Sequence, residues 1–422
     1  MRRAGTAGTP GEQASSGEPG RPGGGASAAG APAAGAPEAG AARARHDATR
    51  TAPAPAAGGP ARPPRAEPEH RPPTMADVAQ LAGVSHQTVS RVLSGHPNVR
   101  PATRENVLAA MARLGYRRNA SARALVTRRT RNLGVVACDT TLYGPASTLF
   151  SLEEAARAEG YFVSTVGLRR LSRDSLAEAL EHLSQGGVEG VVVIAPQSAA
   201  VAAAAELPQP FPVVTVEGGH EQEVAGVSVD QALGARLATE HLLASGHATV
   251  WHVAGPSDWL EAEARRTGWR EALEAAGAPV PEPLSGDWTP QSGYHAGQRL
   301  AGLTRTSALP GGRGGVGAQP LTAVFVANDQ MALGVLRAFR EAGVRVPEDV
   351  AVVGFDDIPE AEYFAPPLTT VRQDFAAVGR HAIRLLLERI EGGARPDRPT
   401  PHVVIEPQLI VRGSSAPAHR AS

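Results

Sequence analysis

Four polar residues near the start of the patterned sequence are spaced to share one face of a helix. His86 and Ser90 form one i, i+4 row in "GVSHQTVSRVLSG", residues 83–95. Gln87 and Arg91 form a second row beside it. A glutamine can make two hydrogen bonds to adenine, and an arginine can make two to guanine. These rows either meet base edges in a DNA groove or are the solvated face of a packing helix.

The residues before these rows predict a helix that ends in a tight turn. "MADVAQLAG" places three apolar residues at helical spacing: Val78, Leu81 and Ala82. Gly83 suits a left-handed turn, and Ser85 can cap the helix that follows. The pattern therefore predicts two helices joined by a short turn.

A third helix is expected to complete a small core. Pro101 opens it and Gly115 ends it. Its expected inward residues are Val107, Leu108, Met111 and Leu114. In the helix that carries the polar rows, the inward residues are Val89, Val92 and Leu93. The unit is predicted to be a small all-α helix-turn-helix headpiece.

Charge is distributed very unevenly along a chain whose net charge is only −1. Residues 75–131 hold ten arginines against Asp77 and Glu105, a net charge of +8, whereas residues 132–422 carry −12. Basic charge concentrated in a small unit is expected of a nucleic-acid-binding module. This basic charge, together with the turn and the polar rows, favours a unit that reads DNA over a three-helix packing domain whose exposed polar face binds nothing.

The composition of the N-terminal segment, the lengths of the apolar runs and the single cysteine indicate which classes of protein the sequence can belong to. Residues 1–73 are rich in Ala, Gly and Pro and poor in large apolar residues, so we expect a disordered extension; Met75 is an alternative start of translation. The sequence has no run of eighteen apolar residues and a single cysteine, Cys138. We therefore expect a cytoplasmic protein without a membrane span or a disulfide framework.

From Leu133 onward, short apolar strands alternate with amphipathic helices, as in "GVVVIA" and "VAVVGF". This alternation predicts parallel α/β structure, and its length favours two similar lobes over one sheet. Ligands bind at the carboxyl ends of strands in such sheets. The expected strand ends here are polar: Cys138, Asp139, Glu217, Asn328, Asp329, Asp356 and Asp357.

An enzymatic interpretation finds little support in the motifs. "GRGGVG", residues 312–317, matches a dinucleotide-binding pattern but follows no expected strand. Asp356 and Asp357 are adjacent in an extended segment, so their side chains should point to opposite sides. The thirteen histidines show no metal-ligand spacing such as H-E-x-x-H. We expect neither catalysis nor a cofactor.

The small unit resembles the DNA-binding headpiece of the lac repressor (LacI/GalR) family. The resemblance rests on "MADVAQLAGVSHQTVSRVLSG", "TRENVLAAMARLGY" and "NASARALVTRR". It implies that a hinge helix at residues 119–126 enters the minor groove, with Leu125 wedged between base pairs. Arg118 stands where the family usually has Pro. The implied DNA-binding residues are Ser85, His86, Gln87, Thr88, Ser90, Arg91, Asn119, Ala122 and Leu125.

The larger unit resembles the effector-binding core of the same family, which is similar in fold to periplasmic sugar-binding proteins. "SGDWTPQSGY", "VANDQMALG", "VVGFDD" and "PPLTTVRQDF" resemble the lac repressor in particular. The implied effector-binding residues are Cys138, Glu217, Arg265, Trp288, Asn328, Asp356, Gln373 and Phe375. Glu217 and Cys138 depart from the lac repressor pattern, which has a shorter acid and a hydroxyl residue there.

These observations predict a cytoplasmic, homodimeric transcriptional repressor that binds a palindromic operator and responds to a sugar. The expected divisions are a disordered extension at 1–73, the headpiece at 74–118, the hinge and linker at 119–131, the two-lobed core at 132–412 and a disordered tail at 413–422. The alternatives are a sugar-binding transport protein, a sugar-processing or nucleotide-using enzyme, and a regulator of this family with a purine or another corepressor.

Overall fold

The computed structural model describes most of the chain from residue 71 onward. The described residues are 71, 73–117, 129–169, 172–197, 202–204, 206–207, 210–217, 224–308, 321–392 and 401–415. They form a three-helix unit, residues 73–117, and a larger α/β core that begins at residue 129.

The three-helix unit consists of α1 (Met75–Ala82), α2 (His86–Leu93) and α3 (Pro101–Leu114). Thr74 caps α1 in a reciprocal capping box with Asp77, and Gly83 ends the helix with a left-handed φ of 63°. Ser85 caps α2 by accepting from the Thr88 backbone N–H at 3.2 Å. The turn and cap residues therefore act as the sequence predicted.

Two leucines of the apolar helical patterns lie on the surface of this unit. The buried core consists of Val78, Ala79, Val89, Val92, Val107 and Ala110. Leu108 is 51% exposed, so its assignment to the inward face was wrong, and Leu81, which belongs to the apolar pattern of α1, is 40% exposed. In α3 the residues that face the core are Val107, Ala110, Met111 and Leu114, spaced i, i+3, i+4 and i+7, so Leu108 lies outside this stripe. In α1 the neighbouring Val78 and Ala79 face the core in place of Leu81.

The first lobe of the core is a six-stranded sheet between two helical layers. Its strand order is β11-β5-β4-β3-β1-β2, and all of its strand pairs are parallel. The strands are β1 (Asn132–Cys138), β2 (Phe162–Leu168), β3 (Val191–Ile194), β4 (Val213–Val216), β5 (Gly226–Val229) and β11 (His402–Ile405). Helices α5 (Tyr143–Ala158) and α12 (Phe375–Gly392) cover one face, and α6 (Arg173–Gln185) covers the other.

The second lobe repeats this plan with the strand order β12-β10-β9-β8-β6-β7. The strands are β6 (Trp251–Ala254), β7 (Leu284–Ser285), β8 (Ala323–Val326), β9 (Ala351–Asp356), β10 (Thr369–Arg372) and β12 (Gln408–Ile410), the last antiparallel to β10. Helices α8 (Gln231–Ala244) and α9 (Leu260–Ala275) cover one face, and α10 (Pro290–Ala308) and α11 (Asp329–Ala342) cover the other. A short 3-10 helix, η1 (Pro359–Tyr363), follows β9.

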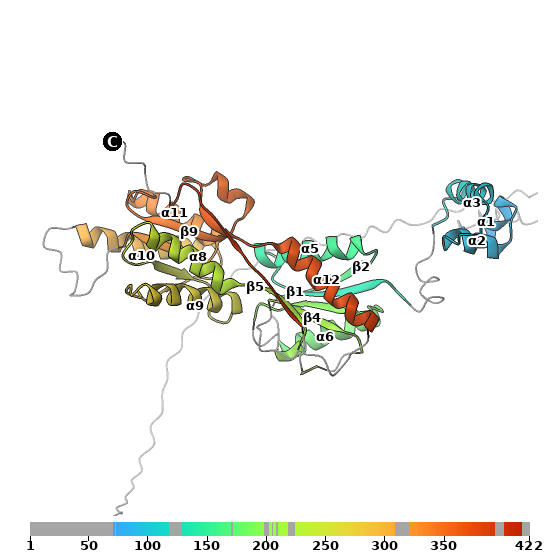
Figure 1. Cartoon of the computed structure of the whole chain (residues 1–422), viewed down its shortest axis with the longest axis horizontal. Helices are drawn as coiled ribbons and strands as arrows, with labels where there is room; N and C mark the ends of the chain where they lie inside the picture. Colours follow the sequence, from blue (N-terminus) through green and yellow to red (C-terminus); the bar gives the residue numbers. More distant parts are fainter. Residues whose placement is uncertain are drawn as a thin grey trace, which may run out of the picture. The chain divides into compact units, whose positions relative to one another are not determined.

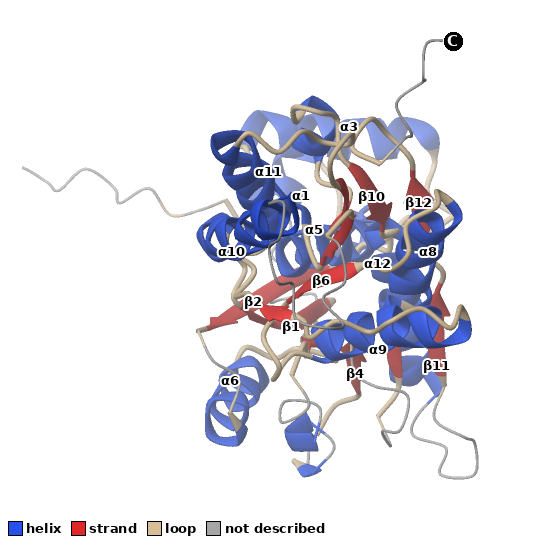
Figure 2. Cartoon of the chain, turned by 90° about the vertical axis from the view of Figure 1, so that its left-hand side faces the viewer, coloured by secondary structure: helices blue, strands red, loops and turns tan. Residues whose placement is uncertain are grey.

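The chain passes between the lobes three times, after β5, after β10 and after β11. Helix α12, from late in the sequence, therefore packs beside α5 from the beginning of the core (Figure 1). The strands of both sheets lie between helices (Figure 2). Since each lobe contains chain from both halves of the core, neither lobe is one continuous stretch of sequence.

The two-lobed α/β architecture expected from the sequence is confirmed, and the sequence missed several strands. The central strands β1, β3, β4, β8 and β9 are almost entirely buried, which explains their unbroken apolar runs. Strands β5, β7, β10, β11 and β12 were not predicted. β7 and β12 have only two and three residues, and "GVSV" and "TTVR" carry polar residues that hide the strand signal.

The chain beyond β12 is more ordered than expected. Ser414 accepts from the Thr369 backbone N–H at 2.8 Å and donates to the Val352 carbonyl at 2.6 Å. Ser415 lies against His241, with 2.8 Å between its Oγ and the imidazole Nε2. Both serines are buried, so a disordered tail from residue 413 is wrong for residues 413–415. None of the described helices is long and apolar enough to cross a membrane.

Helices α8 and α9 approach so closely that only glycine fits at one position between them. A Cβ atom on Gly268 would lie 2.1 Å from the Ala232 carbonyl oxygen. We expect Gly268→Ala to lower the free energy of unfolding of the core by about 1–3 kcal/mol, because backbone must move to admit the methyl group. Urea denaturation measures this change. Gly302→Ala in α10 is the control: nothing lies within 4 Å there, so it should gain about 0.5–1 kcal/mol. Equal stability of the two variants would contradict the packing argument.

Candidate functional site

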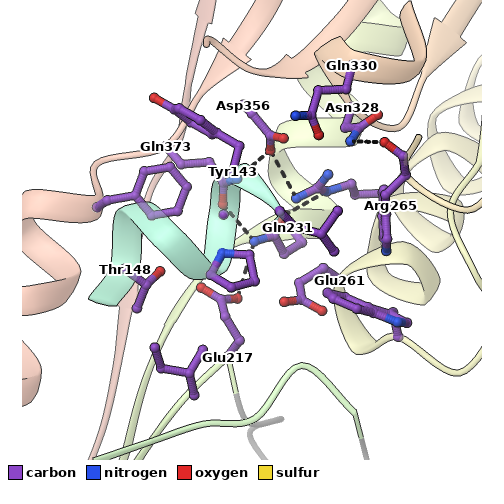
Figure 3. Close-up of a pocket in the computed structure, with 17 residues that line it drawn as sticks. Tyr143, Thr148, Glu217, Gln231, Glu261, Arg265, Asn328, Gln330, Asp356 and Gln373 are labelled. Carbon is purple, nitrogen blue, oxygen red and sulfur yellow. Dashed lines mark hydrogen bonds and ion pairs between the residues drawn. The ribbon is translucent and has the colours of Figure 1, made fainter. Parts of the chain in front are cut away.

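A cleft lined by both lobes brings together most of the polar residues found at strand ends. It contains about 520 Å³ of unoccupied space, including the part that is open to solvent. The first lobe contributes Tyr143 and Glu217, and the second contributes Arg265, Asn328 and Asp356 (Figure 3). Its size falls within the range of small-molecule sites in proteins.

The parallel sheets place these groups at the cleft. Glu217 directly follows β4, Asn328 follows β8 by one residue, and Asp356 is the last residue of β9. The carboxyl ends of parallel strands meet at one edge of each sheet. Glu217, Asp356 and Trp288 also have positive φ values of 65°, 108° and 71°. Such conformations cost about 1–3 kcal/mol each in non-glycine residues and cluster at functional sites.

A ring of hydrogen bonds surrounds the guanidinium of Arg265, which α9 places in the cleft. Its Nε donates to the Gln231 side-chain oxygen at 2.9 Å, and its NH2 lies 3.6 Å from an Asp356 oxygen. The Gln231 amide donates to the Gln373 oxygen at 2.9 Å, and the Gln373 amide donates to Asp356 at 2.8 Å. Arg265 is only 4% exposed, so this ring holds a buried cation in one position.

The two adjacent aspartates point to different sides, as the sequence predicted. Asp356 faces the cleft and Arg265, whereas Asp357 pairs with Arg372 at 2.5 Å and with Arg412 at 2.7 Å. Burial raises the pKa of Asp356 to about 6, although Arg265 and the Gln373 amide oppose the shift. Because they lie on opposite sides, the two carboxylates cannot act together on one bond.

Glu217 and Glu261 form a second acidic group in the cleft. Glu217 accepts from the Gln231 amide at 3.3 Å through one oxygen. The other oxygen of Glu217 and one oxygen of Glu261 are buried and have no hydrogen-bond partner among the described residues. Burial raises the pKa of Glu217 to about 7. Burial, followed by the charge of Glu217, raises the pKa of Glu261 well above its usual range.

Aromatic rings form the apolar part of the cleft. Trp288 and Trp259 meet edge to face with 5.6 Å between their ring centroids, and Tyr143 meets Phe375 at 5.9 Å. A Cβ atom on Gly255 would lie 2.2 Å from the Trp288 ring, so the glycine makes room for the indole. These rings, with the polar groups nearby, can hold a ligand that has apolar faces and a polar rim.

The cleft includes seven of the eight predicted effector-binding residues, and Cys138 is the exception. Those lining the cleft are Glu217, Arg265, Trp288, Asn328, Asp356, Gln373 and Phe375. Cys138 is buried among the side chains between β1 and α6, so the structure does not bring it to the cleft. Alternation along β1 explains this placement: Ala137 faces α5 and α12, while Val136 and Cys138 face α6.

Asn328 caps a helix and also lines the cleft. Its side-chain oxygen accepts from the Met331 backbone N–H at 2.8 Å and caps α11. Its amide donates to the Trp288 carbonyl at 3.1 Å. Asn328 therefore connects the start of α11 to the strained segment that positions Trp288.

Several cleft residues were not predicted from the sequence. They include Tyr143, Thr148, Gln231, Trp259, Glu261 and Gln330. Gln231 follows Asp230, which comes directly after the polar strand β5. An acid or amide just after a strand is the sequence feature from which Gln231 could have been predicted. Glu261 lies within "LEAEARRTGWR", where one buried acid cannot be distinguished from its exposed neighbours by spacing alone.

In the three-helix unit, α2 presents the two predicted polar rows to solvent. His86, Gln87, Ser90 and Arg91 are exposed. Ser85 and Thr88 are hydrogen-bonded to each other, with 2.9 Å between their hydroxyl oxygens. The four exposed side chains thus remain available for a partner, while Ser85 mainly holds the helix start.

Comparisons with known proteins agree with both units. Residues 74–119 match the model of bacterial regulatory proteins of the lacI family, and residues 239–415 match a periplasmic binding protein-like domain. The HTH-type transcriptional regulator CelR of Thermobifida fusca is 38% identical over 361 residues, 82% of this chain and 98% of that protein. The chain belongs to the LacI family of bacterial regulatory proteins. It is a DNA-binding transcriptional regulator with an effector-binding domain, and regulators of this family are not enzymes.

Other LacI-family proteins are similar over most of the chain. The lactose operon repressor of Escherichia coli K12 is 33% identical, covering 77% of this chain and 86% of that protein. The repressor PurR of Haemophilus influenzae is 34% identical, covering 81% and 98%. A lac repressor dimer bound to operator and the anti-inducer ONPF has a TM-score of 0.70 at 31% identity, covering 82% and 99%. A complex of CelR with cellobiose has a TM-score of 0.58 at 34% identity, covering 81% and 99%.

The hinge predicted from the LacI-family resemblance lies outside the described residues. Asn119, Ala122 and Leu125 all fall between residues 118 and 128. Their assignment as DNA-binding residues therefore stays a prediction.

The raised pKa of Glu217 predicts a pH-dependent stability difference in this LacI-family core. A carboxyl whose pKa is higher in the folded than in the unfolded protein stabilises the fold at low pH and loses this contribution as pH rises through about 7. Glu217→Gln has no such loss, so its stability relative to the parent should increase between pH 5.5 and 8. Urea midpoints across this range measure the difference. Glu274→Gln, at an exposed position of α9, is the control. A pH-independent difference for Glu217→Gln would contradict the assignment.

Proposed function

We propose that the protein is a cytoplasmic, homodimeric repressor of carbohydrate-utilisation genes. In this proposal the three-helix unit binds a palindromic operator, and a sugar in the cleft releases it. The observation that carries the sugar assignment is the combination of aromatic walls with a carboxylate, amide and guanidinium network in one cleft. Sugar hydroxyls need directed donors and acceptors, and sugar rings present apolar faces.

The exposed rows of α2 support operator reading in the major groove. Gln87 and Arg91 have the side chains that hydrogen-bond adenine and guanine, and neither is buried. The hinge helix at residues 119–126 is proposed to pair with that of a second copy, with Leu125 as the wedge between base pairs. A palindromic site matched to a two-fold dimer follows from that pairing.

The proposed coupling between sugar and operator requires a difference in affinity between two states. A ligand that touches both lobes binds best in one arrangement of them, because it can satisfy both sets of contacts only there. Glu217 belongs to the first lobe, whereas Arg265 and Asp356 belong to the second. The sugar can weaken operator binding only to the extent that it prefers the released state.

A purine effector is the second candidate, because PurR proteins are among the similar regulators. The Trp288 and Phe375 rings could also stack on a planar base. The sugar is favoured because both lobes contribute polar side chains to the cleft, which suits a ligand with hydroxyl groups around its ring. The other alternative from the sequence, a sugar-binding transport protein, is disfavoured because the chain matches the lacI regulatory model at residues 74–119.

Operator binding tests the DNA-reading part of the proposal. We expect the dimer to bind a family-type palindrome more tightly than non-specific DNA in a gel-shift or anisotropy titration. Arg91→Ala should weaken specific binding by about 1–3 kcal/mol, because one base contact is lost. Arg113→Ala removes the same charge from the exposed surface of α3 and is the control. If both variants lose the same operator affinity, Arg91 contributes only its positive charge and makes no base contact.

Trp288→Ala tests the cleft as the effector site. We expect this variant to lose the response of operator binding to sugar, because the indole forms one wall of the cleft. Titration of galactosides, glucosides and purines into the protein–operator complex measures the response. Operator affinity without ligand reports whether the variant is folded. If operator affinity and sugar response fall together, Trp288 is a folding residue and not a ligand contact.

A further inference from the structure

The cleft offers hydrogen-bond acceptors without matching donors at one end. The amides of Gln231 and Gln373 donate to protein oxygens, and the Asn328 amide donates to the Trp288 carbonyl. The Arg265 guanidinium is directed to Gln231, the Ala327 carbonyl and Asp356. These donors are therefore engaged inside the protein, while the buried oxygens of Glu217 and Glu261 have no partner among the described residues.

Glu217 and Glu261 approach the cleft from different lobes. Glu217 follows β4 of the first lobe, and Glu261 is in the first turn of α9 of the second. Figure 3 shows both carboxyl groups directed into the space below the Arg265 network. The charge of Glu217 is the largest charge acting on the Glu261 carboxyl, which agrees with their closeness. Two carboxyl groups, which carry like charges when both are ionised, thus face each other across the opening between the lobes.

The charges of the cleft do not balance. Three carboxyl groups, on Glu217, Glu261 and Asp356, accompany one cation, Arg265, which lies against Asp356. A neutral sugar would cover these groups without supplying the missing positive charge. Burying an uncompensated carboxylate is costly, whereas an ammonium group donates three hydrogen bonds and brings the opposite charge.

We propose that the effector is an amino sugar, with its protonated amino group held between Glu217 and Glu261. This inference rests on the proposed sugar-binding function and narrows it to a cationic class. The amino group then satisfies the two buried oxygens and joins the two lobes through one ligand atom. Asp356 remains to accept hydrogen bonds from hydroxyl groups on the opposite side of the sugar ring.

The walls of the cleft favour an organic cation over a metal ion. No group of three or more His, Cys, Asp or Glu able to hold a metal ion occurs in the described part of the chain. Trp259 and Trp288 line the same cleft as Glu261, and an aromatic ring attracts a nearby ammonium. The Trp288 Nε1 is buried without a partner among the described residues, so it can donate to a sugar hydroxyl.

The pKa of Glu217, raised to about 7, gives amino sugars a distinct pH signature. An ammonium favours the ionised carboxylate, so its binding expels the proton that Glu217 holds at low pH. Affinity for an amino sugar should therefore rise from pH 5.5 to 7, where the amino group stays protonated. A neutral sugar does not favour the ionised form in this way, so its affinity should not rise over the same range.

The experiment compares matched amino and neutral sugars by isothermal titration calorimetry with the full-length protein. The pairs are glucosamine with glucose, galactosamine with galactose, mannosamine with mannose, and the glucosamine dimer with cellobiose. N-acetylglucosamine retains the skeleton of glucosamine without its charge. We expect at least one amino sugar to bind roughly tenfold or more tightly than its neutral partner, as two charge-assisted hydrogen bonds predict.

Two variants connect this preference to the residues. Glu261→Gln and Glu217→Gln keep the shape of each side chain and remove its charge, so each should reduce the amino-sugar preference by roughly tenfold. Glu274→Gln, exposed on the same helix as Glu261, should leave the preference unchanged.

The outcomes separate this inference from the proposed function. Neutral sugars that bind as tightly as their amino partners in every pair would overturn the amino-sugar assignment and leave the sugar-responsive repressor standing. Binding of purines with no binding of any sugar would overturn both. An amino-sugar preference that survives both glutamine variants would also overturn the assignment, because the charge would then be recognised elsewhere.

Discussion

The buried guanidinium of Arg265 is the group on which the cleft depends. A cation with 4% exposure is stable only where its hydrogen bonds and charge are matched. Here α8 supplies Gln231, the end of β8 supplies the Ala327 carbonyl, and the end of β9 supplies Asp356. The Phe355 ring lies 3.8 Å from the guanidinium carbon. One side chain therefore ties together two helices and two strands of the second lobe, and the positions of the other polar groups follow from this arrangement.

The parallel sheets explain why these groups converge although they are far apart in sequence. Each sheet delivers its strand ends to one edge, and the chain passes between the lobes at α8, α12 and β12. Gln231 lies at the start of the first crossing segment, and Gln373 and Phe375 lie at the second. Residues at the crossings therefore line the cleft as well as connecting the lobes. A ligand in contact with them touches the segments that must bend if the lobes move.

Strong local signals made the fold and much of the cleft predictable from sequence. Unbroken apolar runs identified the buried strands, and Gly83 and Ser85 identified the turn before α2. Signals failed where tertiary packing decides the outcome. Cys138 was predicted to line the cleft, but the alternation of side chains along β1 does not show which of the two sheet faces a residue belongs to. Leu81 and Leu108 fit an apolar helical pattern, yet the small core is filled by valines and alanines instead. The sequence around Glu261 does not indicate that it lines the cleft, because the neighbouring acid, Glu217, is distant in sequence and belongs to the other lobe.

The balance between donors and acceptors also bears on how a ligand could bias the two lobes. Glu217 and Glu261 repel each other when both are ionised. Burial raises the pKa of both carboxyl groups, and the charge of Glu217 adds to the shift of Glu261. A proton relieves the repulsion without joining the lobes. A ligand that donates to both carboxylates relieves it only when both are within reach of one group, so its binding energy depends on the distance between the lobes. That dependence is the differential affinity that allosteric coupling requires, and it arises from two residues on opposite sides of the cleft.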